Sequence, residues 1–105
     1  MMNKLIKDDT ILELIDQLAL ATRGWVLQDH WDGDTHAIGV ASSHNLRRLV
    51  YICTHQEALG SYTYFTEVPN GPEPTDCVHG EEGHGVRFET LLAAMEKHLA
   101  RGDDL

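Results

Sequence analysis

The sequence predicts a single α+β domain in which a four-stranded antiparallel meander is covered on one face by an N-terminal and a C-terminal helix, as a two-layer sandwich. Three observations predict it. Apolar residues recur at helical spacing near both ends, four segments rich in branched and aromatic residues lie between them, and the links between these segments are short. Short links favour antiparallel pairing, and two one-sided helices need a sheet face to cover. With 105 residues, of which 42% are hydrophobic and 24% charged, the chain has the size and composition of one domain, 1–105.

The first element is a helix predicted over 10–23, after a segment, 1–9, that we expect to be frayed. Thr10 and Glu13 have the spacing of a capping box, in which side chains satisfy backbone N–H groups at the helix start. Gly24 then supplies the positive φ angle on which helices commonly end. The apolar positions at helical spacing are Ile11, Leu14, Ile15 and Leu18.

Four strands are predicted next, because the chain changes to segments rich in aromatic and branched residues that are bounded by turn residues. The third strand is apolar on both faces, which is typical of a central strand. The turn between the first two strands falls at Asp32-Gly33-Asp34, since Asp-Gly favours tight hairpin turns. The predicted strands span 25–31, 36–42, 48–54 and 62–68.

The stretch 69–85 is predicted to be a long acidic loop, with a short edge strand around Cys77 and Val78 as the alternative. It contains all three prolines and four of the nine glycines. A second helix is predicted over 88–100, before Gly102. Its apolar residues at helical spacing are Phe88, Leu91, Leu92, Met95 and Leu99.

The net charge of −9, from 17 acidic and 8 basic residues, excludes some partners and favours others. It disfavours nucleic acid, because an acidic surface repels phosphate, and it favours a basic protein partner. Plain solubility is the simpler interpretation of the same surplus. Two cysteines, no leader pattern and no apolar run of about 20 residues indicate a cytoplasmic protein without a membrane segment.

Histidine and cysteine form the sharpest candidate site. Cys53 with His55 and Cys77 with His79 are both Cys-x-His pairs, and His84 follows. Two thiolates and two imidazoles can hold zinc, although structural zinc sites usually space their cysteines by two to four residues. The alternative is that Cys53 is a small core residue and the histidines are solvated.

The sequence favours a protein that is not an enzyme. It contains no Gly-x-Ser-x-Gly elbow and no glycine-rich phosphate loop, so no catalytic residue is predicted. Asp32 and Asp34 could act as paired carboxylates, but the hairpin turn alone explains these residues, and no glutamate stands at the twelfth position of a calcium loop.

Aromatic residues predict a protein-binding surface. Trp25 and Trp31 share one face of the first strand, and Tyr62 and Tyr64 share one face of the fourth. If the helices cover one side of the sheet, some of these rings lie on the open side, where Trp and Tyr commonly anchor interfaces. The alternative is that they are half-buried at the margin of the core. The candidate partner-binding residues are Trp25, Trp31, Asp32, Asp34, Tyr62 and Tyr64.

One segment resembles a known family. Trp31-Asp32-Gly33-Asp34, between a tryptophan-bearing segment and a strand, is similar to a turn in small bacterial immunity proteins of polymorphic toxin systems. The resemblance covers about a quarter of the chain, and Asn45-Leu46-Arg47-Arg48 departs from the Asn-Pro-x-Trp of such relatives. The resemblance implies an acidic inhibitor of a basic toxin such as a nuclease. The other matching residues are Leu27, Gln28, Gly39, Val40, Val50, Tyr51 and Ile52.

Three functions therefore stay open. The leading one is a small protein-binding or regulatory domain, with an immunity-type inhibitor as its most concrete form. The second is a zinc-binding protein. The third is a homo-oligomer that assembles through an exposed aromatic sheet face or an unpaired strand edge.

Overall fold

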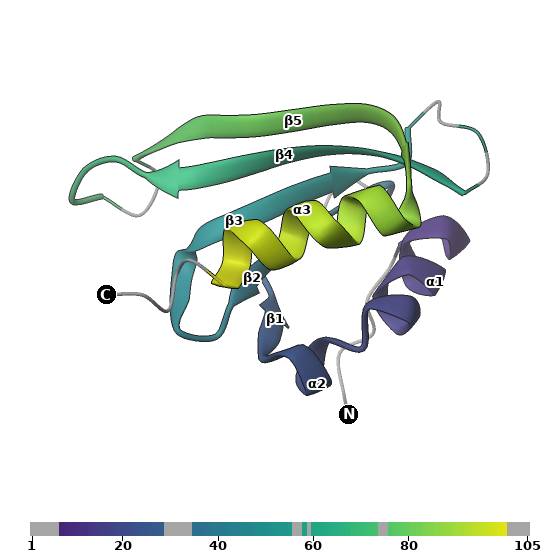
Figure 1. The fold of residues 1–105 in the computed structure, drawn as a ribbon, viewed down its shortest axis with the longest axis horizontal. Helices are drawn as coiled ribbons and strands as arrows, with labels where there is room; N and C mark the ends of the chain where they lie inside the picture. Colours follow the sequence, from purple (N-terminus) through teal and green to yellow (C-terminus); the bar gives the residue numbers. More distant parts are fainter. Residues whose placement is uncertain (1–6, 29–34, 56–57, 59, 74–75, 101–105) are drawn as a thin grey trace.

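The computed structural model describes residues 7–28, 35–55, 58, 60–73 and 76–100, and it shows an α+β fold (Figure 1). One antiparallel sheet contains five strands in chain order, so the predicted meander is confirmed with one strand more than expected. The helix predicted over 88–100 is confirmed at both ends. The elements are α1 Asp9–Leu18, α2 Leu20–Arg23, β1 Trp25–Leu27, β2 Ala37–Ser42, β3 Asn45–Cys53, β4 Ser61–Pro69, β5 Cys77–Arg87 and α3 Phe88–Ala100.

The helical segment before β1 is broken, so the prediction of one helix over 10–23 is wrong in this respect. Ala19 takes a left-handed conformation, with φ 48°, and separates α1 from α2. The Nε of Arg23 donates to the carbonyl of Leu18 (2.6 Å), which satisfies an acceptor at the break. Gly24 ends α2 with φ 75°, as predicted.

The cap of α1 is Asp8 rather than the predicted Thr10. The backbone N–H of Thr10 donates to the Asp8 carboxylate (2.9 Å), and the backbone N–H of Asp8 donates to the carbonyl of Thr35 (2.8 Å). Aspartate is at least as good an N-cap as threonine, and here the same residue also joins the helix to the segment before β2.

Both long helices pack on one face of the sheet, which confirms the two-layer arrangement (Figure 1). Their apolar stripes meet the inward-facing residues of the strands in one core. The helices contribute Ile11, Leu14, Leu18, Leu91, Met95 and Leu99, and the strands contribute Trp25, Ile38, Val40, Val50, Ile52, Tyr62 and Tyr64. No helix in the described ranges is long and apolar enough to cross a membrane.

β5 is the main difference from the predicted loop over 69–85: the edge strand that was its alternative, around Cys77 and Val78, is present and much longer than expected. It is an eleven-residue edge strand, exposed along most of its length. Its glycines fit β4: a Cβ on Gly83 would overlap the Tyr64 ring, and a Cβ on Gly80 would lie 2.7 Å from the Thr66 hydroxyl. Glycine therefore favours this strand by allowing close approach, although glycine is usually a poor strand former.

Two bulges interrupt the pairing of β5 with β4. Opposite Thr66, the register shifts by one residue at Gly80 and Glu81, and the Thr66 hydroxyl accepts the N–H of Glu81 (2.7 Å). A second shift lies opposite Thr63, where Gly85 has φ 63°. Each bulge places two residues of β5 against one of β4 and kinks the edge strand.

Candidate binding face of the sheet

The candidate site is the sheet face that the helices leave uncovered. In β4, the buried residues Tyr62, Tyr64 and Thr66 point toward the helices. Because strand side chains alternate, Phe65 and Glu67 point the other way, and both are only partly buried.

A row of rings crosses this face from β3 to β5. Tyr51 lies directly opposite Phe65, with ring centroids 5.8 Å apart, and His79 stacks on Phe65 at 5.4 Å. His84 meets the same ring edge-on at 5.8 Å. Aromatic pairs at such separations contribute about 0.5–1.5 kcal/mol beyond the area that they bury, so these contacts favour the arrangement of the row.

Carboxylates flank the rings. Glu82 contacts the Nε2 of His84 (3.1 Å), and Glu67 accepts the thiol hydrogen of Cys77 (3.4 Å). More than half of each side chain in the Glu82–His84 pair is exposed, so the pair adds little stability but leaves the carboxylate at the surface. We call Tyr51, Phe65, His79 and His84, with Glu67 and Glu82, the aromatic–histidine face.

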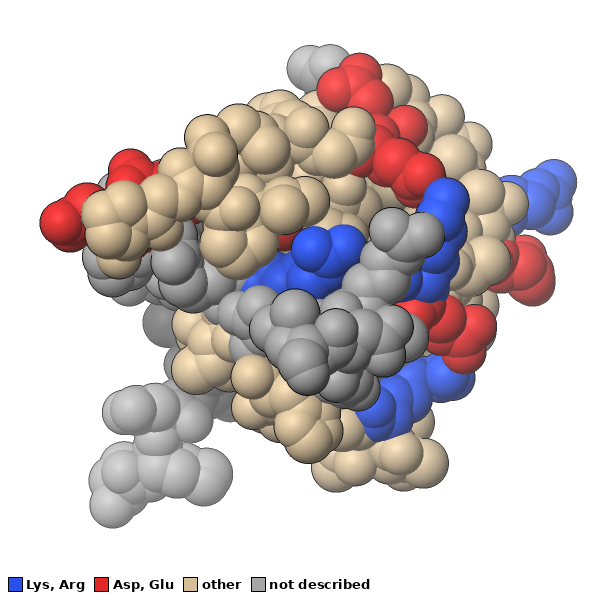
Figure 2. Space-filling view, turned by 60° about the vertical axis from the view of Figure 1, so that its left-hand side comes forward, with Lys and Arg blue, Asp and Glu red and all other residues tan. Residues whose placement is uncertain are grey.

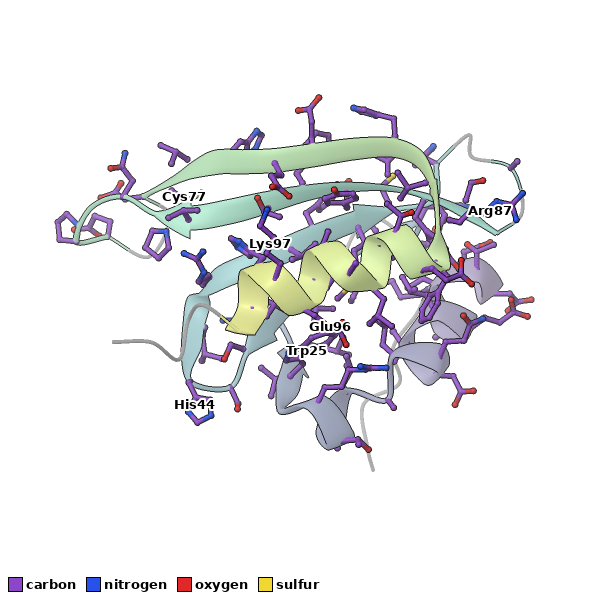
Figure 3. All side chains as sticks on the ribbon, viewed as in Figure 1. Trp25, His44, Cys77, Arg87, Glu96 and Lys97 are labelled. Carbon is purple, nitrogen blue, oxygen red and sulfur yellow. The ribbon has the colours of Figure 1, made fainter. Side chains whose placement is uncertain are left out.

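Several cations lie on the helix side of the molecule instead. Arg23 pairs with Glu96 (3.1 Å), and Lys97 pairs with Glu81 (3.0 Å). Figure 3 shows Lys97 and Glu96 on α3, whereas Arg87 stands at the opposite end of β5 from Cys77. Glu67 and Glu82 therefore lie beside the rings, and Arg87 pairs with Ser61 at the end of β5 that leads into α3.

The residues predicted to bind a partner do not form this face. Trp25, Tyr62 and Tyr64 are only 8%, 6% and 7% exposed and belong to the core under the helices. The expectation that some of these rings lie on the open side is wrong for these three. Trp31, Asp32 and Asp34 lie outside the described residues.

Sequence reasoning missed Phe65 and Tyr51. Phe65 could have been found from its place in the strand. It lies between Tyr64 and Thr66, and a residue between two inward-facing neighbours points outward. Both faces of β4 carry aromatic residues, so the pattern alone did not reveal which face the helices cover.

The five predicted zinc ligands are not brought together. Cys53 pairs with Thr63 and Cys77 pairs with Pro69, six positions further along β4, which is about 20 Å of strand. Neither cysteine is in a disulfide. Within the described part of the chain, no group of three or more His, Cys, Asp or Glu side chains is arranged to hold a metal ion.

A hollow of about 240 Å³ lies between α3 and the β4–β5 pair, on the side opposite to the aromatic–histidine face. Arg48 and Lys97 are among its lining residues, and Figure 2 shows several Lys and Arg side chains near one another on the face that it turns forward. The Nε of Arg48 donates to the carbonyl of His98 (2.8 Å), and Lys97 is paired with Glu81. Both cations therefore have contacts within their own chain.

His98, at the base of this hollow, gives the fold a pH dependence. Its side chain is buried, and its Nε2 donates to the carbonyl of Glu67 (3.0 Å). Burial lowers the pKa of His98; the hydrogen bond to the Glu67 carbonyl opposes this in part, and the Arg48 charge adds to the lowering. The folded chain therefore disfavours protonated His98, whereas the unfolded chain takes up the proton near pH 6.5.

We expect the free energy of unfolding to fall as the pH drops below about 6.5, because the unfolded state then binds more protons than the folded state. Urea unfolding of the wild type and of His98→Gln at a series of pH values between neutral and mildly acidic tests this. The variant should lose stability less steeply toward acid. Identical slopes for the two proteins would contradict a role of His98.

Comparison with known proteins gave no match: no family model, no curated sequence and no solved structure is significantly similar to the chain.

Proposed function

We propose that this protein is a binding domain whose aromatic–histidine face docks a basic protein partner. The observation that supports the proposal is the row of Tyr51, Phe65 and His79 across the uncovered face of the sheet, with Glu67 and Glu82 beside it. Aromatic residues are enriched at the centres of protein interfaces, and charged residues surround them.

The charge of the chain supports the choice of partner. A net charge of −9 accelerates encounter with a basic protein and repels nucleic acid. An immunity-type inhibitor is the most concrete form of the proposal, because nucleases and other toxins that act on nucleic acid present basic clefts. The resemblance at Trp31-Asp32-Gly33-Asp34 points the same way.

The proposal is tested by affinity capture with variants of the face. We expect the wild type to retain a basic protein from the source cell, and Phe65→Ala to weaken this binding by about 2 kcal/mol or more, roughly thirtyfold, as for a central interface residue. Glu67→Gln and Glu82→Gln should each weaken binding, and the weakening should be larger at low salt than at high salt, because salt screens exposed charges.

Leu12→Ala is the matched control. Leu12 is a 40% exposed apolar residue on α1, which packs on the other face of the sheet. The Leu12→Ala variant should retain as much of the basic partner as the wild type does. The proposal would be contradicted if Phe65→Ala retained the partner as well as the wild type does. Circular dichroism should show that Phe65→Ala and Leu12→Ala are both folded.

The inhibitor form makes a separate prediction. If the gene beside this one encodes a basic toxin, co-expression with the wild type should restore growth, and co-expression with Phe65→Ala should not. Rescue by the variant as complete as by the wild type would overturn the inhibitor form.

A further inference from the structure

The hollow between α3 and the β4–β5 pair is lined by both cations and apolar side chains. Arg48 and Lys97 bring positive charge to it, and Val68 and Ala94 bring methyl groups. Val78 pairs directly with Val68, so the two side chains share one face of the sheet, and the exposed Val78 extends the apolar lining toward solvent. Such a lining suits a ligand with a negative head and an apolar body.

A glycine keeps the hollow open. Gly80 lines it, and a Cβ there would lie 2.7 Å from the Thr66 hydroxyl and 3.7 Å from the Cγ2 of Val68, in the space beside these two side chains. The hollow of about 240 Å³ holds about eight groups of the size of a water molecule, at about 30 Å³ each. Its volume therefore selects a small ligand.

Arg48 is oriented for a ligand by its own chain. Its Nε donates to the carbonyl of His98 (2.8 Å), which fixes the plane of the guanidinium group. Among the residues that the structure describes, Arg48 makes no other hydrogen bond or ion pair, so both Nη atoms keep their N–H donors. Two parallel N–H groups of an arginine bind both oxygens of a carboxylate, with a geometry that a single charge does not provide.

Lys97 can exchange its present partner for a ligand. Its ammonium group contacts Glu81 (3.0 Å), but more than half of each side chain is exposed, and exposed ion pairs contribute little to stability. A bound carboxylate can therefore take the place of Glu81 at small cost. The net charge of −9 repels anions at long range, but salt screens this repulsion beyond about 10 Å at moderate ionic strength, whereas the two cations act at contact.

We propose that this hollow binds a small aliphatic carboxylate. The carboxylate group contacts Arg48 and Lys97, and the alkyl chain lies against Val68, Val78 and Ala94. The site is independent of the docking proposal, because the aromatic–histidine face lies on the opposite side of the sheet and contains none of these residues.

Titration with hexanoate tests the proposal, because this acid matches the volume of the hollow. The amide resonances of isotope-labelled protein should shift saturably at Gly80, Glu81 and Lys97, and not at Phe65. Acetate and inorganic phosphate lack the alkyl chain, and 1-hexanol lacks the carboxylate. Each of the three should bind about tenfold more weakly than hexanoate or worse, since each loses either the buried methylene groups or the paired hydrogen bonds.

Three variants test the charged residues. Arg48→Gln should weaken hexanoate binding by about tenfold or more, and its thermal midpoint must be measured as well, because it also loses the contact with the His98 carbonyl. Lys97→Gln should weaken binding by about threefold or more without harm to the fold, since this side chain is exposed. Glu81→Gln should strengthen binding by about threefold, because it removes the negative charge that competes for Lys97.

Arg87→Gln is the matched control. Arg87 is an exposed cation that pairs with Ser61 at the far end of β5, so this variant loses the same charge and should bind hexanoate like the wild type. The proposal is overturned if the wild type shows no saturable shift with millimolar hexanoate, or if acetate, phosphate or 1-hexanol binds as tightly. It is also overturned if Lys97→Gln and Glu81→Gln bind like the wild type, or if Arg87→Gln weakens binding as much as Lys97→Gln.

Discussion

Leu14→Ala is expected to lower the free energy of unfolding by about 2–5 kcal/mol, as buried leucine-to-alanine changes do. Leu14 is fully buried and belongs to the core between α1 and the sheet. The change removes apolar contacts and leaves a cavity that the sheet cannot close. Because domains of this size are stable by roughly 5–15 kcal/mol, the loss is a large share of the total, and urea unfolding measures it.

Leu12→Ala on the same helix is the control. It removes the same atoms from a side chain that is 40% exposed, so its effect should be much smaller, about 0.5 kcal/mol. Helix propensity changes equally in the two variants, and burial alone distinguishes them. Similar losses for the two variants would show that α1 does not pack on the sheet as described.

Gly83→Ala is expected to cost about 1–3 kcal/mol, although alanine is normally tolerated in an exposed edge strand. The added Cβ would overlap the Tyr64 ring, which is buried in the core under the helices. Either the ring must move or β5 must separate from β4. Thermal and urea unfolding of this variant measure the cost.

A double-mutant cycle isolates the contact. In a Tyr64→Leu background the space above Gly83 is larger, so adding Gly83→Ala should cost less there than in the wild type. Strictly additive losses would contradict a direct overlap between the new methyl group and the ring. A harmless Gly83→Ala would contradict the register of β4 and β5 itself.

The sequence predicted the elements that have a one-sided apolar pattern and missed the one that has none. The helix over 88–100 was predicted at both ends, because Leu91, Met95 and Leu99 repeat at the period of a helix with one buried face. Nine of the eleven residues of β5 are exposed, so no alternation marks it. It is held by backbone pairing with β4 and by glycines that fit its neighbour's side chains, and neither leaves a periodic signal.

The candidate sites were harder to predict than the fold because both depend on how the elements pair and pack. Arg48 and Lys97 are distant in sequence, and only the packing of α3 on the sheet brings them to one hollow. Phe65 and Tyr51 became site residues once the helices were seen to cover the opposite face of the sheet. The sequence analysis named His79 and His84 as candidate residues, but it did not name Tyr51 or Phe65.

The two edges of the sheet are poor templates for another strand. β1 offers only three residues, and the bulges divide the long outer edge of β5 into runs too short for continuous pairing. Fibril growth requires a flat, unbroken edge, so we expect neither of the two described edges to favour stacking of copies of this chain. Side chains, rather than backbone ladders, are left to make its contacts with other molecules.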